Sequence, residues 1–201
     1  MNQTKSNNYL LFFVLFLVAL EATLFLVGNN KLNLYFQKEE NKALEIKNKF
    51  DILQIEGKAF SVYDITDHKK LYGRNDHEKM PIASLVKIMT IITALNNNNP
   101  ENIIPMTENA LNQEGAYGFT KDEKFKIKDL AKFSLIGSVN DTTYALAQNT
   151  KDFLSLMNLK AKKIGAQNTV FFNFTGLDIG TDKVGAYSTA EDINLISYFA
   201  F

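Results

Sequence analysis

The chain has 201 residues, of which 46% are hydrophobic and 22% are charged, a composition typical of a globular protein with room for one substantial core. Its 22 basic and 22 acidic residues give a formal net charge of zero, which argues against a nucleic-acid partner. Cysteine is absent from the sequence, which excludes disulfides, thiolate metal sites and cysteine nucleophiles.

The first element is an apolar stretch, residues 9–27, whose one charged residue is Glu21. A helix of this length spans about 28 Å, close to the thickness of the hydrocarbon core of a bilayer. Its Leu, Phe and Val residues favour insertion by about 6 kcal/mol, against a cost of about 3 kcal/mol for a central charge. We therefore predict a cytoplasmic tail at residues 1–8 and a transmembrane anchor at residues 9–28. A cleaved signal peptide is the alternative, disfavoured because no small-x-small cleavage pattern follows the stretch.

The next elements form a polar linker and then a hairpin. Residues 29–55 are polar with sparse apolar positions, which predicts a juxtamembrane linker that is helical in part. Residues 59–65 alternate in the manner of a strand, and the turn at residues 66–68 leads to a second strand at residues 70–72.

Helices and one further strand follow. Residues 84–95 carry a mostly apolar face and end at an asparagine run and Pro100, so we expect a buried helix there. The pattern predicts further helices at residues 127–135, 141–148 and 151–164, the last ended by Gly165, and a strand at residues 170–174.

Ser188 and Glu191 stand three residues apart in a capping-box pattern that opens a final helix. The chain stops inside that helix, at Phe201. Because a domain rarely finishes within an element, we expect the sequence to be truncated there.

Ser84 and Lys87 carry the first chemical signal. Three residues apart at the start of a helix, they project from one face, so the amine can reach the hydroxyl. A serine hydroxyl needs a base, and a lysine can serve when burial and the helix N-terminus lower its pKa. The pair alone is a weak signal, since a helix cap beside a solvated lysine gives the same pattern.

The second signal lies about fifty residues further on. There the segment Ser138-Val139-Asn140-Asp141 stands at the break between two predicted helices. Together with the flanks Pro81 to Thr90 and Ile136 to Ala147, and with later segments around Phe172 to Asp178 and Tyr187 to Asp192, it resembles the serine D-alanyl-D-alanine carboxypeptidases, the low-molecular-mass penicillin-binding proteins. The resemblance covers residues 58–201.

This resemblance implies that Ser84 is the acylated nucleophile and Lys87 its base. It further implies that Ser138 relays a proton to the leaving amine, that Asn140 binds the substrate amide, and that the Ser84 backbone N–H is one oxyanion donor. Val86, Val139 and the Phe174-Thr175 pair depart mildly from the family pattern.

One motif of the family is not found. No Lys-Thr-Gly follows Ser188, and Lys183-Val184-Gly185 precedes it and carries valine in place of the hydroxyl residue. The implied fold is a β-lactamase/transpeptidase-like α/β sandwich, represented by residues 56–201 as a partial D,D-peptidase domain without its C-terminal strands. Loss of one oxyanion donor alone costs about 100- to 1000-fold in rate.

The function that follows is hydrolysis of the D-alanyl-D-alanine end of peptidoglycan stem peptides through an acyl-enzyme, with β-lactams as covalent inhibitors. The domain would then lie outside the cytoplasm, on a single-pass membrane anchor. One alternative is a catalytically incompetent, wall-associated interaction protein; another, less favoured because no glutamate-bearing deacylation loop is evident, is a serine β-lactamase.

Two further classes of site are not expected. His68 and His77 fall in polar turns, so we interpret them as surface residues. The aspartates lack metal-ligand spacing, and we expect neither a metal nor a cofactor.

Overall fold

The structure is a computed structural model that describes residues 3–115 and 117–200, with side chains described for residues 25, 27–115 and 117–200. The chain divides into two compact units, Met1–Ile55 and Glu56–Phe201.

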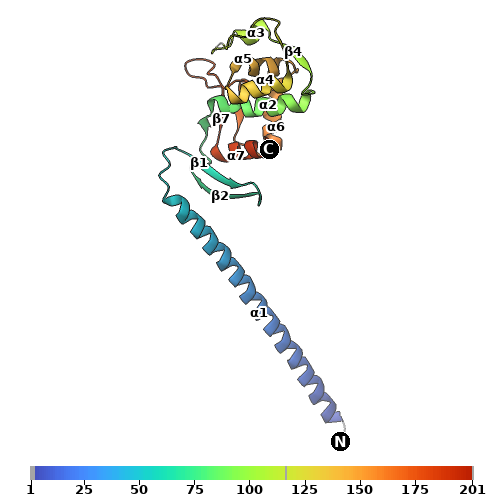
Figure 1. Cartoon of the computed structure of the whole chain (residues 1–201). Coiled ribbons are helices and arrows are strands. Elements are labelled where there is room, and N and C mark those ends of the chain that lie inside the picture. The colour runs from blue at the N-terminus through green and yellow to red at the C-terminus, as the bar shows by residue number, and fades with distance from the viewer. Residues whose placement is uncertain (1–2, 116, 201) are drawn as a thin grey trace. The chain divides into compact units, whose positions relative to one another are not determined.

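The first unit consists of one long helix, α1 (Gln3–Asp51) (Figure 1). The segment predicted as a linker is therefore helical as far as Asp51, more than the sequence pattern indicated. An ion pair one turn apart, Lys49 Nζ to Glu45 Oε1 at 2.7 Å, supports its last turns.

The predicted anchor at residues 9–28 falls mostly on residues whose side chains lie outside the described part, Glu21 among them. Among the residues that are described, no helix combines the length and the apolar character that a bilayer crossing requires.

The second unit mixes helices and strands, in agreement with the predicted α/β class. Its helices are α2 (Val86–Asn97), α3 (Glu108–Leu111), α4 (Ile127–Ile136), α5 (Asn140–Gln148), α6 (Phe153–Lys163) and α7 (Ala190–Ala200), with a 3-10 turn, η1 (Ala83–Leu85), directly before α2. The strands are β1 (Phe60–Asp64), β2 (Lys69–Arg74), β3 (Met80–Pro81), β4 (Ile103–Pro105), β5 (Lys124–Lys126), β6 (Val170–Phe171) and β7 (Ala186–Ser188).

The described strands pair antiparallel in three small sheets. β1 and β2 form the predicted hairpin, with a bulge between Val62 and Tyr63. β7 lies between β3 and β6, which pairs Met80 with Ser188 and Val170 with Tyr187. β4 pairs with β5. Helix α7 packs against β1 (Figure 1).

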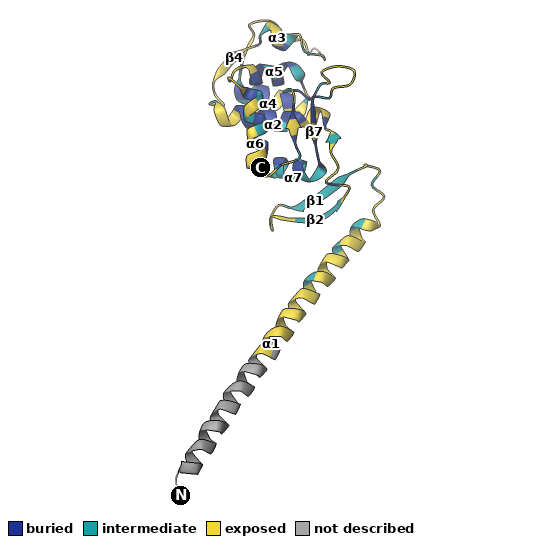
Figure 2. Cartoon of the chain, turned by 180° about the vertical axis from the view of Figure 1, so that it is seen from behind, coloured by how far each residue is buried: buried dark blue, intermediate teal, exposed yellow. Residues whose placement is uncertain are grey.

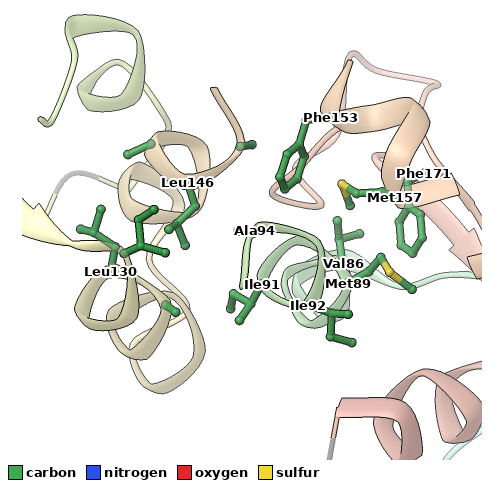
Figure 3. Packing of buried hydrophobic residues seen from close by; sticks show 14 of the residues in the cluster. Val86, Met89, Ile91, Ile92, Ala94, Leu130, Leu146, Phe153, Met157 and Phe171 are labelled. Carbon is green, nitrogen blue, oxygen red and sulfur yellow. The ribbon is translucent and has the colours of Figure 1, made fainter. Parts of the chain in front are cut away.

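Helix α2 is the centre of the core. Its residues Val86, Met89 and Ala94 are fully buried, and Ile91 and Ile92 nearly so; a helix that is apolar on most sides is stable when other elements surround it. Figure 3 shows α2 end on, with Leu130 of α4 and Leu146 of α5 on one side and Phe153, Met157 and Phe171 on the other. Buried residues accordingly gather in α2, α4 and α5 (Figure 2).

The asparagine run ends α2 by side-chain hydrogen bonds. The Nδ2 atom of Asn97 donates to Thr93 O at 2.7 Å, and that of Asn98 donates to Ala94 O at 3.0 Å. These bonds satisfy carbonyl groups that the last helical turn leaves free. At the end of α6, Gly165 adopts a positive φ of 94°, the backbone form that commonly terminates helices.

Two local predictions are wrong. Thr189, not Ser188, caps α7, since its Oγ1 accepts from Asp192 N at 3.1 Å; Ser188 belongs to β7 and bonds Thr169 Oγ1 at 2.7 Å, while Glu191 turns to Lys70. Strand β6 stops at Phe171 instead of residue 174 because Asn173 bends the chain: its side chain accepts from Gly176 N at 2.8 Å and donates to Leu177 O at 2.6 Å.

Candidate functional site

Ser84 and Lys87 are in direct contact. Ser84 lies in η1 and Lys87 in the first turn of α2, and Lys87 Nζ donates to Ser84 Oγ at 2.8 Å. Because the 3-10 turn runs directly into the α-helix, residues three apart stay on one face of the backbone. The contact predicted from the spacing is therefore present.

Lys87 is a buried amine with an uncharged environment. Its side chain is 2% exposed, and Nζ donates a second hydrogen bond to the carbonyl oxygen of Thr175 at 3.0 Å. Burial lowers the pKa of Lys87 from 10.5 to about 8, because a charged ammonium loses hydration that the two neutral oxygen partners replace only in part. An appreciable fraction of Lys87 is therefore neutral near physiological pH, as a general base must be.

The segment that carries Thr175 packs closely against the turn that carries Ser84. Gly176 has a φ of 85°, and a Cβ atom there would overlap with the carbonyl of Ala83. Ala83 itself has a positive φ of 42°. Thr90 Oγ1, one turn after Lys87, donates to Phe174 O at 2.6 Å. The absence of a side chain at Gly176 thus lets two backbones meet and places the Thr175 carbonyl against Lys87.

Ser138 occupies the tight turn between α4 and α5. Its φ of 54° lies in the left-handed region, an uncommon conformation for a residue other than glycine. A Cβ atom on Gly137 would come within 2.9 Å of Val139 Cγ2. The absence of a side chain at Gly137 therefore leaves room for the buried Val139 side chain.

One cleft joins the two motifs. A cavity of about 510 Å³ is lined by Ser84, Lys87 and Ser138, with Leu85 and Leu135 among the apolar residues around them. Asn140 is not among the described lining residues of this cavity; it opens α5 two residues after Ser138, and its Nδ2 donates to Glu114 O at 2.8 Å. The structure thus brings three of the four predicted site residues together and places the fourth beside them.

The backbone carbonyl that accepts from Lys87 could not be predicted from the sequence. Thr175 acts through its backbone carbonyl, which any residue supplies, so side-chain identity there carries no signal. The available signal was the Asn173-x-x-Gly176 spacing, because asparagine and glycine together favour a tight turn.

Both histidines lie outside the lining of the Ser84 cavity. The His77 side chain is 67% exposed and its Nδ1 lies 2.7 Å from Glu191 Oε2, and His68 contacts Tyr198. Asp76, His77 and Glu191 bring three ligand-type atoms within 4.8 Å of one another, but the Lys70 ammonium already pairs with both carboxylates there.

Comparison with known proteins identifies the family. The family model described as D-alanyl-D-alanine carboxypeptidase, peptidase S11, matches residues 44–200. The chain belongs to this family of serine peptidases.

Individual relatives of the chain are D-alanyl-D-alanine peptidases, in agreement with the family model. The chain is 30% identical over 152 residues to a D-alanyl-D-alanine carboxypeptidase, DacF, of Bacillus subtilis, covering 71% of this chain and 38% of the relative. It is 30% identical over 139 residues to a D-alanyl-D-alanine endopeptidase of Pseudomonas aeruginosa, covering 66% and 43%. The chain therefore spans about two fifths of the length of these relatives.

Solved structures share the fold. Penicillin-binding protein D2 of Listeria monocytogenes, solved in an ampicillin-bound form, superposes with a TM-score of 0.62 at 31% identity, covering 74% of this chain and 62% of that one. The carboxypeptidase DacD of Francisella tularensis gives a TM-score of 0.65 at 31% identity, covering 73% and 37%. The second unit thus has the mixed helix and strand fold of the penicillin-binding proteins.

Proposed function

We propose that this protein is a serine D-alanyl-D-alanine carboxypeptidase that acts on peptidoglycan stem peptides through an acyl-enzyme. The observation that carries the proposal is the contact of Ser84 Oγ with the buried Lys87 amine, whose pKa of about 8 suits a general base. Family membership and the named activity of the Bacillus relative support the substrate class.

In the proposed reaction, neutral Lys87 takes the proton of Ser84 as Oγ bonds to the carbonyl carbon of the penultimate D-alanine. One Lys87 N–H stays on Thr175 O, which directs the nitrogen lone pair toward Ser84. Ser138 then gives its hydroxyl proton to the leaving D-alanine nitrogen as the peptide C–N bond breaks, and takes up in its place the proton that Lys87 removed from Ser84. Water finally hydrolyses the ester on Ser84. Asn140 holds the substrate amide during these steps.

A β-lactam tests this reaction because Ser84 Oγ would attack the carbonyl of its ring. The ring C–N bond then breaks, and a stable ester remains on the serine. We expect a fluorescent penicillin to label the protein and Ser84→Ala to abolish the label. Ser155→Ala, on the exposed face of α6, is the matched control and should label like the parent. A label that survives Ser84→Ala would refute Ser84 as the nucleophile.

The rival proposal is a catalytically incompetent wall-associated protein. The two proposals differ in one assay: the enzyme releases D-alanine from a peptide ending in D-alanyl-D-alanine, and the incompetent protein binds it unchanged.

We further propose that residues 9–28 anchor the protein in the cell membrane with the peptidase unit outside the cytoplasm. The support is the apolar run of residues 9–27 and a wall substrate that lies beyond the membrane. The protein should then stay with membranes through alkaline carbonate extraction, and release into the soluble fraction would contradict the anchor.

A further inference from the structure

The connection between α3 and β5, described at residues 112–115 and 117–123, is bonded to the turn that carries Ser138 and Asn140. The Tyr117 hydroxyl donates to Gly137 O at 2.8 Å. The Tyr117 backbone N–H donates to the carboxylate of Asp141. Asn140 Nδ2 donates to Glu114 O at 2.8 Å. The three bonds thus hold the turn at Gly137, at Asn140 and at Asp141.

The Glu114 carbonyl decides which way the Asn140 amide faces. A carbonyl oxygen can only accept, so the atom against it must be the NH₂ group of Asn140 and not Oδ1. Within the described residues Oδ1 is shielded from solvent and has no hydrogen-bond partner, so no bond on that side resists a flip of the amide. The bond to Glu114 is what holds the orientation, and the NH₂ group has a second N–H that can donate to another acceptor.

Asp141 is the buried anchor of this arrangement. It is 1% exposed, and burial raises the pKa of its carboxyl group above the ordinary value, with the bond from the Tyr117 N–H acting in the opposite direction. One carboxylate oxygen lacks a partner among the described residues. Burying a carboxylate with so few bonds is costly. Among the residues that the structure describes, the bond that it accepts from outside its own backbone comes from Tyr117.

Gly115 completes the approach. It has a φ of 85°, and a Cβ atom placed on it would lie 3.8 Å from Asn140 Nδ2. The glycine therefore turns the chain directly over the Asn140 amide, which brings the Glu114 carbonyl within hydrogen-bond distance.

We propose that Tyr117 and Asp141 are positioning residues of the peptidase reaction, which hold the Glu114 carbonyl on Asn140 so that its amide presents an N–H to the acylamide carbonyl of the substrate. The inference rests on the proposed function and adds a layer to it. In this proposal the segment from Glu114 to Tyr117 controls one contact with the substrate and leaves the nucleophile unaffected.

The test compares two acylating agents that differ in this contact. Benzylpenicillin carries an acylamide group, whereas 6-aminopenicillanic acid lacks it. We expect Tyr117→Phe to slow acylation by benzylpenicillin about five- to tenfold, the effect of one lost hydrogen bond, and to leave acylation by 6-aminopenicillanic acid within about twofold. Asp141→Ala should show a larger loss of the same selectivity, which Asp141→Asn should largely restore because its amide oxygen can still accept from Tyr117 N.

Tyr198→Phe is the matched control, since it removes a hydroxyl that contacts His68 instead; it should leave both rates unchanged. Equal slowing of the two compounds by Tyr117→Phe would indicate a general structural role and overturn the proposal, as would an unchanged benzylpenicillin rate.

A second readout keeps the inference testable if the parent protein reacts with neither compound, a result that would count against the proposed function itself. The side-chain NH₂ signals of Asn140 in NMR spectra should shift and exchange faster with water in Tyr117→Phe and in Asp141→Ala, but not in Tyr198→Phe. Unaltered Asn140 signals in both variants would overturn the positioning role.

Discussion

At the scale of single residues, the surroundings of Lys87 suit the proposed role of general base. Its two hydrogen-bond partners are a hydroxyl and a backbone carbonyl, and neither carries the negative charge that would hold the amine protonated. Burial then lowers the pKa to about 8.

The first prediction concerns the pH dependence of acylation. Only neutral Lys87 accepts the Ser84 proton, so the neutral fraction rises as pH increases through the pKa. The rate of acylation by a penicillin should therefore increase with pH and level off above a midpoint near 8. Stopped-flow kinetics or gel labelling at a series of pH values measures this acylation rate.

Lys87→Met should remove this rise together with nearly all labelling, while Lys163→Met, at the exposed end of α6, should preserve both. A rate that is flat between pH 6 and about 9 in the parent protein would contradict the role of Lys87, because the fraction of neutral amine changes strongly over that range.

The Ser84 and Lys87 pair could be predicted from the sequence because a three-residue spacing at a helix start fixes which side chains meet. The Thr175 carbonyl could not, since a backbone acceptor 88 residues away leaves no trace in side-chain identity. The same reason hid Glu114, which also contributes a carbonyl.

At the scale of elements, the turn from Asn173 to Leu177 shapes the site by approaching η1. Gly176 combines a positive φ of 85° with a position where any Cβ would overlap with Ala83 O. Substitution there strains the backbone and pushes the Ser84 turn away from Thr175.

The second prediction is that Gly176→Ala lowers the free energy of unfolding by about 2 to 4 kcal/mol, from left-handed strain and overpacking together, and reduces penicillin labelling. Urea unfolding measures the first effect. Gly180→Ala is the control, because its Cβ would meet no atom within 4 Å, and a similar loss in both variants would contradict the close approach.

A partly buried group of charged residues links the hairpin to the last helix. Asp76, 6% exposed, pairs with Lys70 of β2, and its backbone carbonyl accepts from Glu191 N of α7 at 3.1 Å. Burial alone would raise the pKa of Asp76, but the hydrogen bond and charge of Lys70 outweigh it, so the pKa lies below the ordinary 3.8.

The third prediction follows from this lowered pKa. A carboxyl group whose pKa is depressed by folding stabilises the protein above its unfolded pKa and loses that contribution as pH falls through the folded value. Asp76→Asn should therefore lower the free energy of unfolding at pH 7 by about 1 to 3 kcal/mol, and the difference from the parent should shrink below about pH 4. Asp67→Asn, on the exposed hairpin turn, should have little effect; a deficit for Asp76→Asn that stays constant down to pH 2 would argue against the ion pair.

Most of the helices and the β1–β2 hairpin could be predicted from the sequence, whereas helix α3 and the short strands β3, β4, β5 and β7 were not predicted. Apolar periodicity located α2, α4, α5 and α6, and alternation located the hairpin, because one buried face imposes both patterns. The cap of α7 could not be assigned in the same way: Ser188 and Thr189 both offer a hydroxyl, and only the pairing of β7 with β3 and β6 decides that Ser188 points to Thr169.

At the scale of the whole second unit, α2 links the core to the chemistry. Its sides pack against α4, α5 and α6 (Figure 3), while its N-terminal turn carries Lys87 beside Ser84. The packing around α2 therefore holds Lys87 beside Ser84, and the Ser138 turn lines the same cleft because α4 and α5 pack on that helix. Convergence of segments so far apart in sequence is a property of the fold, which spacing alone did not specify.

The most direct measurement of the central claim is the position of the penicillin adduct. Trypsin cuts after Lys79 and Lys87 and releases residues 80–87, a peptide in which Ser84 is the one hydroxyl side chain. Mass spectrometry after reaction with benzylpenicillin should find the added mass on this peptide, and none on the peptide that contains Ser138. An adduct elsewhere, or a protein that stays unmodified at saturating penicillin, would contradict a lysine-activated Ser84.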